Sequence, residues 1–355
     1  MRQGDSNQQP YDPRRKSARI ITLLILSVVA ALLVSGIWLA TGFMQSEGGP
    51  AGRKPQKSQG LVITNPSPQT NTNSGETGKP PKSPEKDVEK KLSPDPMPFY
   101  AALEERGLKL EGVCSKDDPV ARRLLEEYGA MFVASESVKP PPVCIFASEA
   151  EVLKYQNEAQ FTSATVGGTQ IQLQPAAMKA LMDARQEAHR QGLDITPRGG
   201  SQAARRSYGD TRRLWNSRFL PGLAYWNSRG RLSREEVARL RQLSLHDQVA
   251  AVLELERSGV FFSTDHSKSI LYSVAAPGAS QHISMLALDV AQFGNGRVRQ
   301  ILAQHGWFQT IKSDLPHFTF LGVDEKELPS RGLRSVKLGA QVFWIPNVAD
   351  NSQRK

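Results

Sequence analysis

Two histidines and an aspartate near the C-terminal end of the chain could bind one metal ion together: His282, Asp289 and His317. Two imidazoles and a carboxylate are a common ligand set of catalytic zinc, which keeps a fourth position for water. Zinc lowers the pKa of such a water toward about 7, so that a hydroxide nucleophile is present at neutral pH. A second carboxylate is needed to pass a proton to the leaving amine, and Asp314, three residues before His317, is placed for this role. Because any chain with six histidines contains some triple of this kind, the spacing alone is weak evidence.

The residues around the triple carry a more specific pattern. Residues 276–289 resemble the S-x-H-x-x-G-x-A-x-D signature of the zinc D-alanyl-D-alanine carboxypeptidases and dipeptidases associated with vancomycin resistance. Residues 314–320 look like the second motif of that family, E-x-x-H followed by an apolar strand. Upstream, residues 205–208 and 211–215 are similar to its Y-R-S-Y-x-x-Q stretch. The resemblance covers residues 173–322, in the order in which the family has its motifs.

This resemblance implies a metallopeptidase that trims peptidoglycan stem peptides, most of all at a D-alanyl-D-alanine terminus. Carried over position by position, it implies that His282, Asp289 and His317 are zinc ligands and that Asp314 is the general base. The expected cofactor is Zn²⁺, and the expected partner is a cell-wall peptide.

The same carry-over gives Arg206 the role of stabilising an oxygen of the substrate or transition state, since a guanidinium can donate two hydrogen bonds to a carboxylate or an oxyanion. A surface salt bridge is the alternative role for Arg206. Ser280 is expected to support the metal site and, together with Arg206 and Ser207, to help bind the substrate.

Three positions depart from the family pattern: Met285 replaces the glycine of the first motif, Asp314 the glutamate of the second, and Arg205 a tyrosine. In one straight strand, His282 and Asp289 would lie about 23 Å apart and on opposite faces, so a shared zinc requires a bend between them. Glycine makes such a bend easily, whereas methionine does not where φ must be positive. These departures leave open a second function, a catalytically weak or silent domain of the same fold that binds wall peptide or a partner protein.

The N-terminal part of the chain predicts a membrane anchor. Residues 1–19 are polar and end in a cluster of arginines and a lysine, whereas residues 20–44 carry no charge. An apolar run of that length can cross a bilayer as one helix, and the basic flank holds the N-terminus in the cytoplasm. A cleaved signal peptide is the alternative, although its apolar region is usually shorter, about 7–15 residues. Residues 45–96 lack large apolar side chains and predict a flexible linker. The remainder is therefore expected outside the cytoplasm, on the periplasmic or cell-wall side.

The folded part is expected to be α+β, with a small antiparallel sheet and flanking helices that hold the zinc cleft. Helical spacing and caps predict helices at 118–128, 148–155, 175–192 and 297–305, and one from Ser233 that breaks near Ser244. Alternation predicts strands at 143–146 and 166–173, the latter as strand or hairpin around two glycines. Helices and strands do not alternate regularly, which favours α+β over a parallel α/β fold. We expect an N-terminal part at 97–172, the carboxypeptidase-like zinc domain at 173–349 and a tail at 350–355.

The chain has two cysteines, Cys114 and Cys144, and both fall in the part expected outside the cytoplasm. An even count in that compartment favours a disulfide between them, with two buried free thiols as the alternative.

The formal net charge of +10 raises the question of nucleic-acid binding. The basic residues are spread over the tail, the linker and several helices, and no aromatic side chains interleave with a concentrated basic run. The sequence therefore predicts no nucleic-acid partner. It also lacks the glycine-serine-glycine elbow of serine hydrolases and a phosphate-binding glycine loop.

Overall fold

The computed structural model describes residues 98–115 and 117–348, which all belong to one compact unit. The predicted cytoplasmic tail, membrane helix and linker, and the tail at 350–355, lie outside the described residues. Within the described part, no helix is both long and apolar enough to cross a membrane.

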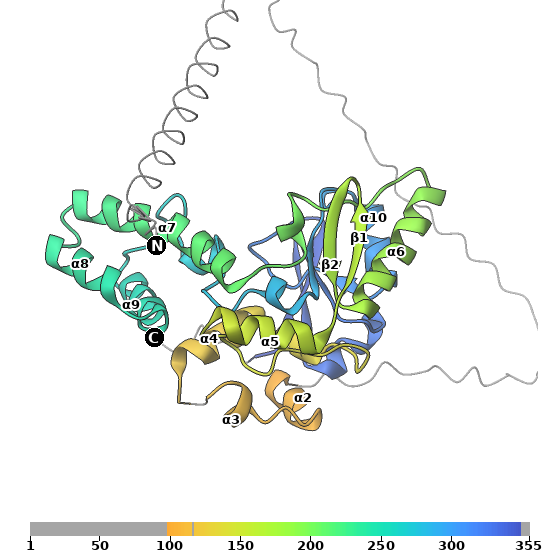
Figure 1. Ribbon diagram of the computed structural model, residues 1–355, viewed down its shortest axis with the longest axis horizontal. Coiled ribbons are helices and arrows are strands. Elements are labelled where there is room, and N and C mark those ends of the chain that lie inside the picture. The colour runs from red at the N-terminus through yellow and green to blue at the C-terminus, as the bar shows by residue number, and fades with distance from the viewer. Residues whose placement is uncertain (1–97, 116, 349–355) are drawn as a thin grey trace, which may run out of the picture. The chain divides into compact units, whose positions relative to one another are not determined.

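The described chain combines helices with three small antiparallel sheets, which confirms the α+β class. Its α-helices are α2 (Phe99–Glu105), α3 (Leu110–Val113), α4 (Pro119–Tyr128), α5 (Glu149–Ala159), α6 (Pro175–Arg190), α7 (Tyr208–Ser228), α8 (Arg234–Gln242), α9 (Leu245–Arg257) and α10 (Gly296–Gln304). Its strands are β1 (Thr162–Val166), β2 (Thr169–Leu173), β3 (Ala287–Asp289), β4 (Trp307–Phe308), β5 (His317–Phe320), β6 (Leu333–Leu338) and β7 (Gln341–Pro346). In Figure 1, α7, α8 and α9 gather on one side of the molecule, and β1, β2 and α6 lie on the other.

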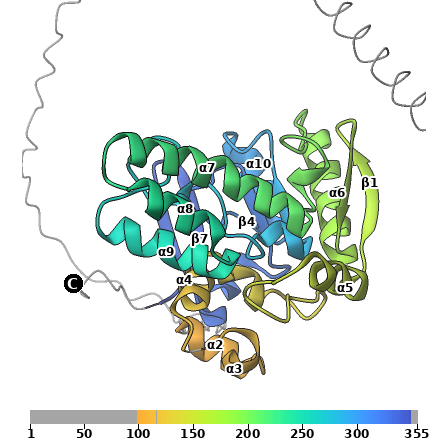
Figure 2. The ribbon, with the colours of Figure 1, turned by 60° about the vertical axis from the view of Figure 1, so that its left-hand side comes forward.

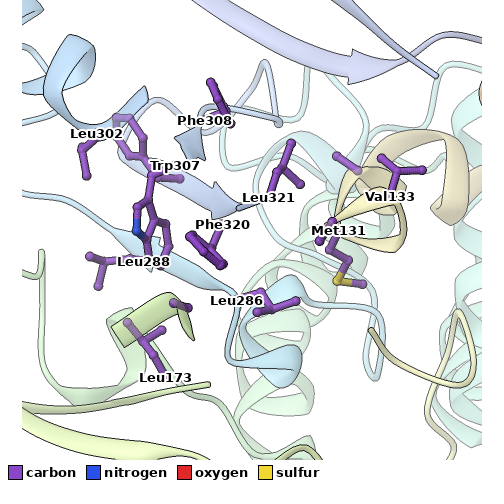
Figure 3. Packing of buried hydrophobic residues seen from close by; sticks show 14 of the residues in the cluster. Met131, Val133, Leu173, Leu286, Leu288, Leu302, Trp307, Phe308, Phe320 and Leu321 are labelled. Atoms are coloured by element: carbon purple, nitrogen blue, oxygen red, sulfur yellow. The ribbon is translucent and has the colours of Figure 1, made fainter. Parts of the chain in front are cut away.

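The three-stranded sheet, in the order β3-β5-β4, lies in the main hydrophobic core. Figure 3 shows Leu288 of β3, Trp307 of β4 and Phe320 of β5 close together, and all three are buried. The core joins residues from 99–134 to residues from 286–333, so the two parts predicted at 97–172 and 173–349 share one packed interior. Burial of this apolar surface fixes the sheet on which two of the candidate ligands lie.

Several predicted elements are confirmed on the side of β1 and β2. The strand or hairpin predicted at 166–173 corresponds to the turn and second strand of a hairpin, β1–β2. Its turn residues Gly167 and Gly168 both have positive φ. Helix α6 buries its apolar face against the core, and Gly192, with φ of +69°, follows the end of the helix. Positive φ costs glycine little, which is why both turns contain it.

The helices α7, α8 and α9 form a lobe with its own apolar core, which includes Trp215, Phe219 and Phe262. Figure 2 shows the three helices stacked beside one another. Ser233 and Glu236 form a capping box at the start of α8. The predicted break near Ser244 is confirmed, because α8 ends at Gln242 and the Ser244 side chain caps α9.

The segment around the cysteines differs from its prediction in one respect. Cys114 and Cys144 are joined in a disulfide, with their Cα atoms 5.4 Å apart. The strand predicted at 143–146 is wrong, because this segment has no neighbouring strand to pair with. Its backbone is irregular: Cys144 N–H donates to Val113 O, and Phe146 N–H donates to Gly278 O. The apolar residues at 143–146 are buried or half-buried by this docking and not by a sheet.

Candidate metal centre

Three short segments bring the candidate ligands together. His282 lies in a 3₁₀ turn (Gln281–Ser284), Asp289 is the last residue of β3, and His317 is the first residue of β5. The antiparallel register pairs Asp289 directly with His317, so their side chains leave the same face of the sheet. The sheet therefore supplies two of the three ligands, and the 3₁₀ turn supplies the third.

The bend required between His282 and Asp289 is present at Met285. Its backbone adopts the left-handed conformation, with φ of 57° and ψ of 27°, between the 3₁₀ turn and β3. This is the position at which the family has glycine, and positive φ is strained for a residue with a long side chain. The Met285 side chain is buried in a small apolar cluster with Ile283 and Tyr155.

The three ligand atoms form a nearly regular triangle. His282 Nε2 lies 3.1 Å from His317 Nδ1, and Asp289 Oδ1 lies 3.3 Å from each of these nitrogens. With zinc bonds of about 2.0–2.1 Å, two ligands of a regular tetrahedron lie about 3.3–3.4 Å apart. The triangle therefore matches one face of a tetrahedral zinc site, and the group could hold a metal ion.

The electrostatic state of the three residues suits a cation. Burial, and the charge of Arg206 nearby, lower the pKa of His282 to about 4, so that this imidazole is neutral at neutral pH. Burial alone would raise the pKa of Asp289, but its contacts with His282 and His317 outweigh it and hold the pKa well below the usual range. Asp289 Oδ1 is buried and has no hydrogen-bond partner, so it is free to bind an ion.

Arg206 precedes α7 and pairs with one of the candidate ligands. Its Nη2 lies 3.0 Å from Asp289 Oδ2, and its Nε–H donates to the backbone oxygen of Gln202. Both side chains of the ion pair are largely buried, at 19% and 14% exposed, so the surface salt bridge is not the arrangement found. The pair orients Asp289 so that Oδ1, and not Oδ2, faces the histidines.

Asp314 and Ser280 both line a cavity of about 230 Å³ that is also lined by His282, His317 and Arg206. Burial raises the pKa of Asp314, although the nearby His317 opposes this. No described residue makes a hydrogen bond or an ion pair with the Asp314 carboxylate. A carboxylate with a raised pKa and no partner is suited to accept and return a proton.

Two other residues singled out in the sequence lie elsewhere. The Ser207 side chain accepts the N–H of Asp210 and caps α7, and Ser207 does not line the cavity. Arg205 points the other way, where it donates to Gln156 and Gln172 and stacks on Phe161. Arg205 therefore supports the fold beside α5 and β2.

Sequence patterns did not reveal three residues that line the same cavity: Tyr128 of α4, Arg218 of α7, and Tyr272. Arg218 donates only to Ser217 within the described part of the chain, and its Nε is buried without a partner. The helical lobe thus brings a second guanidinium to the cavity. No local signal marks Arg218, because its place depends on how α7 packs against the rest of the unit.

No protein-family model matches this sequence, and a search of curated proteins finds no match.

Proposed function

We propose that the chain is a zinc metallopeptidase, similar in activity to a D-alanyl-D-alanine carboxypeptidase, which hydrolyses peptidoglycan stem peptides. The observation that carries the proposal is the triangle of His282, Asp289 and His317, whose edges of 3.1–3.3 Å fit a tetrahedral ion with one position left for a ligand. Two nitrogens and one carboxylate oxygen favour zinc over calcium or magnesium, which prefer oxygen ligands.

Zinc in such a site acts as a Lewis acid that polarises a carbonyl group and acidifies water. The residues of the cavity supply the remaining functions. Asp314 accepts a proton from the attacking water and returns it to the leaving amine, because its carboxylate has no other partner. Arg206 orients Asp289 through its Nη2 and can stabilise a developing oxyanion with its remaining donors. Ser280 is a further polar group at the cavity wall.

The substrate class rests on the motif residues that resemble the vancomycin-resistance carboxypeptidases and dipeptidases. We propose in addition that a membrane helix at 20–44 and a linker at 45–96 hold the enzyme on the outer side of the membrane, where the wall peptide lies.

A first prediction concerns the metal. The purified chain should bind about one equivalent of zinc with tetrahedral nitrogen and oxygen coordination, as measured by elemental analysis and X-ray absorption. His317→Ala should lose the ion, because one of the three ligands is removed. His305→Ala is the matched control, since His305 pairs with Glu187 between α10 and α6 and should leave binding unchanged. A native chain that stays metal-free in micromolar zinc rules out the site.

A second prediction concerns Arg218. A peptide with a free terminal carboxylate should pair with this guanidinium, and such a charged hydrogen bond contributes about 1.5–3 kcal/mol. Arg218→Ala should therefore raise KM about 10- to 100-fold and leave kcat nearly unchanged, because the contact is equal in ground and transition states. Arg212→Ala removes an exposed arginine of the same helix and should change neither. If Arg218→Ala raises the KM for a peptide amide as much as the KM for the free acid, Arg218 does not bind the carboxylate.

A further inference from the structure

Gln281, next to His282 in the 3₁₀ turn, is almost completely buried and has four hydrogen-bonding neighbours. Its Nε2 lies 2.7 Å from the backbone oxygen of Tyr128 and 3.5 Å from Thr310 Oγ1. Its Oε1 lies 2.8 Å from His317 Nε2 and 2.5 Å from Thr319 Oγ1. Every polar atom of this side chain therefore has a partner in the interior.

The neighbours determine which way the amide faces. A backbone carbonyl only accepts hydrogen bonds, so the NH₂ group of Gln281 must face Tyr128 and the oxygen must face His317. Thr319 donates to the same oxygen, and its hydroxyl is then free to accept from Thr310, 2.6 Å away. The network is self-consistent only in this orientation.

An amide oxygen cannot donate, so the hydrogen between Gln281 and His317 must belong to His317 Nε2. A neutral imidazole carries one N–H, and its other nitrogen keeps the lone pair. In His317 that other nitrogen is Nδ1, the atom that lies 3.3 Å from Asp289 Oδ1 and 3.1 Å from His282 Nε2. The tautomer that satisfies Gln281 is the tautomer that can bind a metal ion.

We propose that Gln281 is a positioning residue of the metal centre: its buried amide oxygen fixes the tautomer and the ring orientation of His317 and so directs Nδ1 at the ion. The proposal rests on the proposed zinc site for its effect on affinity, but the hydrogen bond between His317 Nε2 and Gln281 is present without a metal ion. Two hydrogen bonds hold Gln281 in place. One joins its Nε2 to the Tyr128 oxygen of α4, and the other joins its Oε1 to Thr319 of β5.

Two substitutions separate this role from a merely structural one. Gln281→Glu keeps an acceptor for His317 but lacks the NH₂ donor to Tyr128, whereas Gln281→Met lacks both groups. Loss of the partner of a metal-binding histidine typically weakens metal affinity about 10- to 100-fold. We therefore expect Gln281→Met to bind zinc about 10- to 100-fold more weakly, and Gln281→Glu to stay within a few-fold of the native chain, in competition with a chromophoric chelator.

Gln248 offers a matched control. It is also buried, accepts from the Trp215 ring N–H at 2.8 Å and donates to the Leu240 oxygen, but within the described chain it makes no hydrogen bond with a histidine. Gln248→Met should lower the thermal stability of the metal-free chain and leave zinc affinity unchanged. If Gln281→Glu loses as much zinc affinity as Gln281→Met, the tie to Tyr128 is what matters and the positioning role is wrong.

The native metal-free chain, labelled with ¹⁵N-histidine, gives a readout that needs neither zinc nor activity. Its His317 should show a protonated Nε2, hydrogen-bonded to the Gln281 oxygen, in two-bond ¹H–¹⁵N correlation spectra. An unprotonated Nε2 overturns the proposal, whether or not the variants fold. A native chain that shows the expected tautomer but binds no zinc would instead refute the proposed function and leave the Gln281–His317 contact standing.

Discussion

Asp314→Ala is expected to abolish the turnover of D-alanyl-D-alanine peptides while zinc stays bound. Asp314 lines the cavity beside His282 and His317 but is not part of the ligand triangle, so its removal should spare the metal. Loss of a positioned acid–base group typically slows a reaction about 10²- to 10⁴-fold. The measurement is D-alanine release from a pentapeptide, with the zinc content of each sample determined in parallel.

Two conservative variants sharpen this test. Asp314→Asn keeps the shape of the side chain and removes its ability to accept a proton, so it should be as slow as the alanine variant. Asp314→Glu restores the residue of the family motif and moves the carboxylate forward by about one methylene, which can change a rate strongly because catalysis depends on placement within about 1 Å. An active native enzyme that is indifferent to Asp314→Asn would exclude this residue as the base.

The same variants distinguish the peptidase from a silent binding domain. If the native chain binds zinc but releases no D-alanine, and Asp314→Glu gains activity, the natural protein is a binder on a peptidase fold. If both bind zinc and neither cleaves, the proposed substrate class is wrong. Activity in the native chain that disappears with Asp314→Asn supports the enzyme.

Local patterns in the sequence predicted those parts of the structure that depend on neighbours along the chain. Helix α6 and the break before α9 follow from apolar spacing and from Ser244 as a cap, and both are within a few residues of their predicted bounds. The strand predicted at 143–146 failed because its apolar residues are buried by the docking of Phe146 on Gly278, a contact between segments more than a hundred residues apart. Periodicity cannot tell burial in a sheet from burial by an irregular segment.

The candidate site also contains some residues that local motifs predicted and others that they did not. The motifs located His282, Asp289 and His317, and the register of β3 on β5 explains why Asp289 and His317 meet. Gln281 and Arg218 escaped notice because their significance depends on partners from other elements. Gln281 acts through contacts with His317 and α4, and Arg218 reaches the cavity only because the helical lobe packs against it.

Met285 occupies a left-handed position where the motif that this segment resembles has glycine, and this has an energetic consequence that can be measured. The left-handed conformation costs a residue with a side chain about 1–2 kcal/mol. Burial of the methionine opposes this cost, because truncation of a buried methionine to alanine typically destabilises a protein by about 2–5 kcal/mol. Since burial is the larger effect, both Met285→Ala and Met285→Gly should unfold more easily than the native chain in denaturant titrations of the metal-free protein.

The order of the two variants tests the strain. Glycine tolerates φ of 57° and alanine does not, so Met285→Gly should be about 1 kcal/mol more stable than Met285→Ala. Met178, buried on helix α6, is the matched control: there the helical conformation makes the glycine variant about 1 kcal/mol less stable than the alanine variant. Equal stability of the two variants at 285 would mean that this backbone is not strained. If the glycine variant is the more stable one at 285 and the less stable one at 178, the backbone at 285 is strained. The bend between His282 and Asp289 then tolerates methionine because burial of its side chain contributes more than the strain costs.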